Sequence, residues 1–324
     1  MKFFSEISFM KQKLMTKVIY SLIPLILASV YFFGWRSLVL LIWVSALGII
    51  VEWLFQRKSS KKVSQAVLVT SILYTLTLPP STPFWVAGLG IIFGIIFGKE
   101  VFGGFGRNVF NPALVARAFV YVCFPKYLTL QWSSASNSLL GGFGVYLTEP
   151  IDVLSHSTPM LIFRESGAMA SYFDLLWGNV SGSLGETSGI LIIISAVYLI
   201  YTKTASFETI IGMTVGFTGL SSILHFSGIS QVPNPLFGIL SGGFLFGAVF
   251  MATDPISSPR TKEGRWIYGV IIGIVAVIIR GFALFAGGVM FAILIGNTFA
   301  PIIDESVKHY KKYKKNRERR VAHG

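Results

Sequence analysis

Long apolar stretches separated by short polar connections dominate the sequence. Ten such segments are visible, with centres near Leu25, Val44, Ser71, Ile92, Ala116, Ile193, Met213, Phe244, Ile274 and Ala292. A helix that crosses a bilayer needs about 20 predominantly apolar residues, and several of these segments are shorter. The pattern predicts an all-α polytopic membrane protein with about ten transmembrane helices, some of them broken or re-entrant.

Lysine and arginine gather at alternate connections between these segments. The clusters are Lys11, Lys13 and Lys17 before the first segment; Arg57, Lys58, Lys61 and Lys62 after the second; Lys99 and Arg107 after the fourth; Lys203 after the sixth; Arg260, Lys262 and Arg265 after the eighth; and Lys308, Lys311, Lys312, Lys314, Lys315, Arg317, Arg319 and Arg320 after the tenth. Basic residues beside membrane helices face the cytoplasm. Ten spans with both termini in the cytoplasm put every cluster on that side, and put the polar connection at residues 125–186 outside.

Parts of the first half of the chain recur in the second. Thr77-Leu78-Pro79 recurs as Thr253-Asp254-Pro255, Trp85 and Lys99 recur at the same spacing as Trp266 and Arg280, and Gly103-Gly104 recurs as Gly287-Gly288. With ten spans the copies run in opposite directions, which predicts two inverted five-helix repeats with a ligand site where broken helices meet. The predicted units are a first membrane repeat (1–124), an extracytoplasmic loop (125–186), a second membrane repeat (187–304) and a basic cytoplasmic tail (305–324).

Composition narrows the classes of function. Of the 324 residues, 53% are hydrophobic and 13% are charged, whereas soluble proteins carry about 25% charged residues. The net charge of +13 comes from helix ends and from the tail, which favours anchoring at anionic membrane lipid over binding to nucleic acid. A single cysteine, Cys123, excludes an internal disulfide and a cysteine-ligated iron–sulfur or zinc site within the chain. We therefore expect no metal site here.

The segment from Gly103 to Phe119 combines glycines with two amides. The glycines permit a tight turn between helices, and the segment matches no nucleotide-binding loop. Asn108 and Asn111 are expected to share one helix face, because side chains three residues apart are neighbours on a helix. An unpaired amide in a bilayer is costly, so each should bind a neighbour or a ligand. A flavin ring, flat and apolar with polar edges, would fit such a pocket.

Charged residues inside or beside apolar segments are candidates for an ion path. Arg117 needs a partner, for which Glu52 is one candidate. Asp254 and Asp304 stand at predicted cytoplasmic ends of helices, where each either caps a helix or lies beside moving cations. Both Na+ and H+ remain open as the ion.

The polar connection contains Asp152-Val153-Leu154-Ser155-His156-Ser157-Thr158-Pro159-Met160. By residue type alone this is a Ser/Thr-rich turn that ends at a proline. A nearby segment of similar form, Ser166-Gly167-Ala168-Met169, has no hydroxyl at its fourth position. Ser183 and Glu186 have the spacing of a capping box, which would open the sixth membrane helix.

Three of these segments resemble a known family. The pattern D-x-x-S-x-[AS]-T-P-[LM] at residues 152–160, with residues 103–119 and 249–304, is similar to the D component of the Rnf electron-transport complex and to its relative, the B component of the Na+-translocating NADH:quinone reductase. The resemblance implies FMN joined to a threonine through a phosphoester bond. The site residues that it implies are Thr158 as the acceptor; Asp152, Ser155 and Pro159 in the supporting loop; and Asn108 and Asn111 at a second, non-covalent flavin such as riboflavin.

The same resemblance implies a function. The relatively short N-terminus favours the Rnf protein, a flavin-carrying translocase subunit of a ferredoxin:NAD+ oxidoreductase in a bacterial or archaeal cell membrane, coupled to Na+ or H+ transport. Its partners would be other Rnf subunits, including a second extracytoplasmic flavoprotein and iron–sulfur subunits, and an FMN transferase. The alternatives are a role like that of the B component of the quinone reductase, a flavin-free transporter or channel for small solutes, and a membrane scaffold for redox partners.

Overall fold

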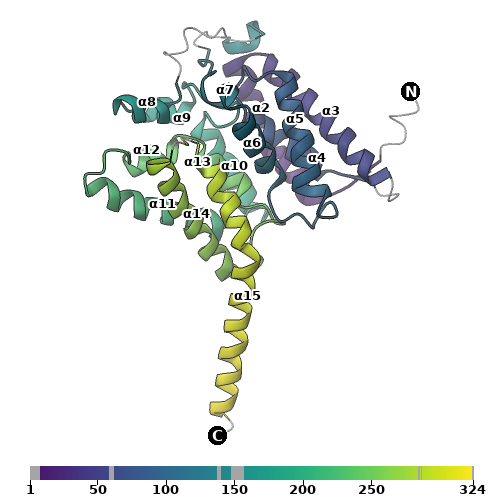
Figure 1. Cartoon of the computed structure of the whole chain (residues 1–324), viewed down its shortest axis with the longest axis vertical. Coiled ribbons are helices and arrows are strands. Elements are labelled where there is room, and N and C mark those ends of the chain that lie inside the picture. Colours follow the sequence, from purple (N-terminus) through teal and green to yellow (C-terminus); the bar gives the residue numbers. More distant parts are fainter. Residues whose placement is uncertain are drawn as a thin grey trace.

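The computed structural model describes residues 8–57, 62–136, 140–146, 157–283, 285 and 287–322, and nearly every element in it is a helix (Figure 1). The first half contains α2 (Lys13–Phe33), α3 (Arg36–Arg57), α4 (Ala66–Leu76), α5 (Phe84–Ile95) with its π-helical continuation η1 (Ile96–Glu100), and α6 (Pro112–Cys123). The connection contains α7 (Pro125–Thr129), η2 (Gly141–Gly144), α8 (Pro159–Ser166) and α9 (Tyr172–Trp177). The second half contains α10 (Gly189–Tyr201), α11 (Phe207–Phe226), α12 (Pro235–Leu240), α13 (Phe244–Phe246) with the π-helix η3 (Gly247–Met251), α14 (Lys262–Phe282) and α15 (Val289–Ala322).

The predicted helical membrane protein is confirmed. In the described part of the chain, five helices are long and apolar enough to cross a membrane: α2, α3, α11, α14 and α15. The centre of every predicted apolar segment falls inside a helix, and α4, α6 and α10 are shorter apolar helices. The one departure from an all-α fold among the described residues is a two-residue parallel pairing of β1 (Phe9–Met10) with β2 (Val63–Ser64).

Glycines bring α11 and α14 into backbone contact. Gly212 and Gly216 on α11 contact Gly269 and Gly273 on α14. Within each helix the two glycines are about one turn apart. A methyl group on Gly269 would lie 2.6 Å from the carbonyl oxygen of Thr209. Small residues are what allow helices to pack closely in a membrane, where apolar side chains gain little by leaving lipid for a neighbouring helix.

Buried hydrogen bonds join the first half of the chain to the second. The backbone N–H of Asn111 donates to Asn297 Oδ1 at 3.2 Å, and Asn111 Nδ2 donates to the carbonyl oxygen of Met251 at 3.4 Å. Elsewhere Ser195 Oγ on α10 donates to the carbonyl oxygen of Ser21 on α2 at 2.8 Å. Because a buried polar group without a partner is costly, these bonds fix how the two halves sit against each other.

The two cations of the sequence repeat, Lys99 and Arg280, are both buried, at 2% and 3% exposure. Lys99 Nζ forms an ion pair with Glu52 Oε2 at 2.6 Å. Arg280 instead donates to the carbonyl oxygens of Gly238 and Ser241 at the C-terminal end of α12, at 2.7 and 3.2 Å. A helix C-terminus carries partial negative charge, so carbonyl oxygens replace the carboxylate as the counter-charge.

The arrangement of the connection positions the candidate site. α8 and α9 lie at the end of the molecule opposite the C-terminal end of α15, which projects away from the other helices (Figure 1). Between α12 and α13 the helical conformation is interrupted at Gly242 and Gly243, whose φ angles are +59° and +70°. Such positive angles favour glycine. The break, α8 and the segment before α10 together line one pocket.

Candidate functional site

Thr158 is the N-cap of α8. Its backbone is extended, with φ −62° and ψ 152°, and its Oγ1 accepts a hydrogen bond from Leu161 N at 3.4 Å. Pro159 follows at the first helical position, where its missing N–H costs nothing, and Gly167 ends the helix with a φ of +74°. Because the oxygen acts here as an acceptor, the hydroxyl proton of Thr158 is not used by the cap.

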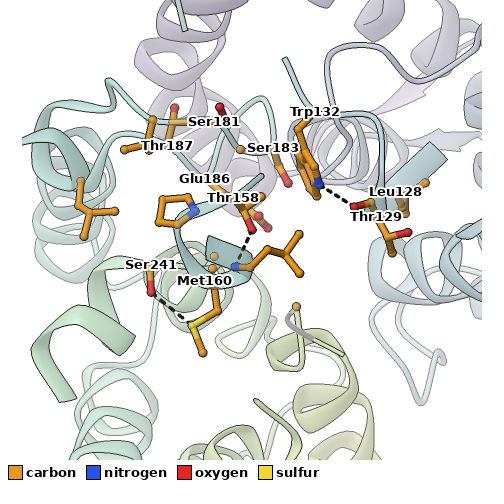
Figure 2. Close-up of a pocket in the computed structure, with 18 of the residues that line it drawn as sticks. Leu128, Thr129, Trp132, Thr158, Met160, Ser181, Ser183, Glu186, Thr187 and Ser241 are labelled. Atoms are coloured by element: carbon orange, nitrogen blue, oxygen red, sulfur yellow. Dashed lines mark hydrogen bonds between the residues drawn. The ribbon is translucent and has the colours of Figure 1, made fainter. Parts of the chain in front are cut away.

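Thr158 lines a pocket with about 820 Å³ of free space, its mouth included. The walls come from α6, α7, α8, α9, the residues before α10 and the break between α12 and α13. Figure 2 shows Thr158 and Met160, at the start of α8, beside Glu186 and Ser241 in this pocket. They combine apolar side chains with hydroxyl groups; among them are Leu128, Trp132, Pro159, Met160, Leu175, Ser181, Ser183, Thr187 and Ser241.

An ion pair completes the pocket, and it differs from the predicted one. Arg117 Nη1 on α6 lies 2.6 Å from Glu186 Oε1, with the side chains 13% and 10% exposed. The predicted partner of Arg117, Glu52, is bound instead to Lys99. The prediction that Arg117 has an acidic partner holds, but its choice of partner is wrong.

The predicted local role of Glu186 is also wrong. In the predicted capping box it would satisfy the start of a helix, but α10 begins at Gly189 with Ser188 as its N-cap. The Glu186 carboxylate lies against Gly243, where a methyl group would come within 2.6 Å of it. The glycine therefore leaves room for the carboxylate to reach Arg117. Sequence spacing gave no sign of this contact, because the three residues come from segments far apart in the chain.

Asn108 and Asn111 line a second pocket, of about 650 Å³, together with Lys99, Phe105 and Asp254. They do not share a helix face as predicted. Asn111 is the N-cap of α6, where its Oδ1 accepts from Ala113 N at 3.0 Å, and Asn108 lies in the irregular segment before it. The predicted tight turn itself is confirmed, since Gly103, Gly104 and Gly106 all have φ angles between +86° and +101°.

The remaining candidate acids each have local partners. Asp254 Oδ2 accepts from Ser257 Oγ at 2.6 Å and from Ser257 N at 3.2 Å. Asp304 accepts from the backbone N–H groups of Arg260 and Thr261 at 2.7 and 2.9 Å, just before α14. Asp254 therefore supports a turn after η3, and Asp304, which lies within α15, supports from the side the residues that precede α14. The prediction that Asp304 stands at a helix end is wrong. The ion path stays a prediction.

Two predicted loop residues, Asp152 and Ser155, lie outside the described residues. Met169, which occupies the position without a hydroxyl, is 52% exposed. Among the described residues, no group of three or more histidine, cysteine or acidic side chains is placed to hold a metal ion.

These features define a class, a multi-pass helical membrane protein whose pocket lies where its helices break. The sequence profile of the NQR2, RnfD, RnfE family matches residues 5–313, and the chain belongs to this family. The resemblance found in the sequence is thereby confirmed.

Named relatives share much of the sequence. The B component of the Na+-translocating NADH-quinone reductase of Azotobacter vinelandii is 39% identical over 269 residues, which cover 79% of this chain and 63% of that protein. The protein of the same name from Yersinia pestis is 35% identical over 310 residues, covering 93% of this chain and 70% of its own length. The chain thus spans a little under two thirds of the Azotobacter relative.

Proposed function

We propose that this protein is the flavin-carrying membrane subunit of an ion-translocating redox complex, with FMN esterified to Thr158. The observation that carries the proposal is the place of the Thr158 hydroxyl, which lines a pocket of apolar and hydroxyl-bearing side chains at a helix N-terminus. Membership of the NQR2, RnfD, RnfE family supports it. In the role that we favour, the protein serves an Rnf-type ferredoxin:NAD+ oxidoreductase and couples electron transfer to Na+ or H+ transport.

The residues of the pocket fit FMN. A phosphoryl group on Thr158 would lie at the N-terminus of α8, where backbone N–H groups and the helix dipole favour an anion. Trp132 and Met160 offer apolar surface to a ring, and Ser183 offers a buried hydroxyl that has no partner among the described residues. Bound FMN would supply the ability to accept and release electrons, while the protein holds and orients it.

The same proposal extends to the second pocket and to the ions. Asn108 and Asn111 are assigned to a non-covalent flavin such as riboflavin, because both line one pocket together with apolar side chains such as Phe105. Glu52, Arg117, Asp254 and Asp304 are assigned to an ion path. All four carboxylate or guanidinium groups are already bound by protein groups, so an ion passing there must displace existing bonds.

We assign the chain ten membrane segments in two inverted five-helix repeats, with both termini in the cytoplasm and residues 125–186 outside. The matched burial of Lys99 and Arg280 supports the repeat. The placing of α8 at the end of the molecule opposite the C-terminus of α15 supports opposite sides for the two (Figure 1).

Cysteine labelling tests this topology. In a Cys123→Ser background, Ser166→Cys is expected to react with a membrane-impermeant maleimide added to intact cells. Ser306→Cys, on the exposed part of α15, is expected to react only after the membrane is permeabilised. Labelling of both from the same side would contradict the assignment.

A Thr158→Val variant tests the flavin. The protein is co-expressed with an FMN transferase, denatured and separated on a gel, so that fluorescence reports covalently bound flavin alone. We expect a fluorescent wild-type band and complete loss of fluorescence in Thr158→Val, because valine has no oxygen to esterify. Thr129→Val is the matched control, since Thr129 lines the same pocket and its hydroxyl donates to Pro125 O within α7; this band should stay fluorescent.

Each other outcome has a definite meaning. A dark wild-type band removes the support for electron transfer and favours a flavin-free transporter or channel. A fluorescent Thr158→Val band keeps the function and moves the acceptor to another residue. Loss of flavin with assembly and electron flow unchanged would indicate a scaffold.

The quinone reductase is the second candidate, because the relatives described above are its B component. The purified complex separates the two. Reduction of NAD+ by reduced ferredoxin would support the Rnf role, whereas reduction of quinone by NADH without ferredoxin would support the quinone reductase role. Sodium dependence of either reaction would identify the coupling ion.

A further inference from the structure

The pocket that contains Thr158 holds one balanced pair of charges. Of the described residues that line it, Arg117 and Glu186 alone carry a formal charge. The same two residues line a smaller cavity of about 240 Å³ that reaches Met251. Their side chains are largely enclosed by protein, so a charge on either is poorly screened by water and salt.

Arg117 is not fully bonded. Its Nη1 donates to Glu186, but its Nε is buried and has no hydrogen-bond partner in the described part of the chain, and the same is true of Ser183 Oγ in the same pocket. Buried polar groups are normally paired. Two unpaired donors in a single pocket therefore point to a ligand that brings acceptor atoms.

We infer that Arg117 stabilises negative charge on the flavin held at Thr158 and that Glu186 opposes it, so that the pair sets the reduction potential of the flavin. This inference rests on the proposed function. Each electron that a reduced donor protein passes to the flavin leaves the donor and adds one negative charge to the pocket, unless a proton follows. An enclosed cation favours that charge and an enclosed carboxylate disfavours it.

The two residues then have opposite effects, which an ion pair with a purely structural role would not produce. Glu186→Gln removes a negative charge from the pocket, so the midpoint potential of the flavin is expected to rise. Arg117→Gln removes a positive charge, so the midpoint potential is expected to fall. Each shift should change the ratio of reduced to oxidised flavin at a fixed potential by roughly tenfold, which is about 30 mV for a two-electron couple. The double variant restores a neutral pocket and should lie near the wild type.

The measurement is a spectroelectrochemical titration of purified protein in which covalent flavin has first been confirmed by gel fluorescence. Arg265→Gln is the control, because it removes an ion pair with Glu208 (3.8 Å) that lies outside the pocket, and it should leave the potential unchanged. Shifts in the same direction for both single variants, or no shift, overturn the inference. If Arg117→Gln does not accumulate, Glu186→Gln decides alone, and a potential that fails to rise overturns it. A wild type without covalent flavin overturns the proposed function instead.

Discussion

Gly273→Ala is expected to lower the free energy of unfolding by at least about 2 kcal/mol, because it forces α11 and α14 apart. The added methyl group would overlap the carbonyl oxygen of Met213 and would come within 2.5 Å of Phe217 N. Both are backbone atoms of a helix, so neither can rotate out of the way. The helices can accommodate the methyl group only by separating, and this weakens the contacts at Gly212, Gly216 and Gly269 as well.

Gly219→Ala is the matched control for this prediction. Gly219 lies on α11, as two of the contacting glycines do, but a methyl group there meets no described atom within 4 Å. Alanine is favoured over glycine in a helix by about 1 kcal/mol, so this variant should be neutral or slightly more stable. The measurement is the thermal unfolding midpoint of the purified protein in detergent. Equal midpoints for the two variants would show that the glycine contact is not tight.

The sequence predicts the elements of this fold well, because each depends on residues close together in the chain. Apolar segments of sufficient length specify helices in a membrane whatever they pack against. The turn at Gly103 and Gly104 was predicted from residue type, and both have positive φ angles. The turn at Thr158 and Pro159 was likewise predicted, and it proves to be the start of α8.

Ion pairs between residues far apart in the chain could not be predicted from local sequence patterns. Arg117 needs a partner, and Glu52 was one candidate, yet Arg117 binds Glu186. The position of each residue along its helix indicates the correct pairing. Glu52 lies in the last turns of α3, and Lys99 lies in η1 at the end of α5, which follows after one intervening helix. Both therefore lie at the same end of the bundle, and Arg117, near the middle of α6, does not.

The two asparagines show a second limit. Their spacing suggested a shared helix face, but that holds only if both residues are helical. Pro112 favours the first turn of a helix, which makes Asn111 the N-cap and leaves Asn108 outside. This signal was present in the sequence. In contrast, the bond from the Asn111 backbone to Asn297 depends on how the two halves meet, and no local pattern encodes it.

Lys99→Met is expected to lower the free energy of unfolding by about 3–5 kcal/mol, because it leaves the Glu52 carboxylate buried without its cation. Glu52 and Lys99 are 1% and 2% exposed and lie 2.6 Å apart. Ser64 completes the group: its N–H donates to Glu52 Oε1 at 2.9 Å, and its Oγ accepts from Lys99 Nζ at 2.7 Å. After the substitution, the backbone N–H of Ser64 is the one remaining donor to this carboxylate that the described contacts provide.

The double variant Glu52→Gln, Lys99→Met separates the energetic role of this pair from a role in ion transport. Glutamine is neutral and keeps an oxygen to accept from Ser64 N, so no buried charge remains. We expect the double variant to recover at least about 2 kcal/mol of the loss, measured by the same thermal unfolding assay. No recovery would show that the destabilisation arises from packing and not from the unpaired carboxylate. If the recovered protein carries covalent flavin but its complex no longer moves cations, Glu52 belongs to the ion path; unchanged transport would confine the pair to the fold.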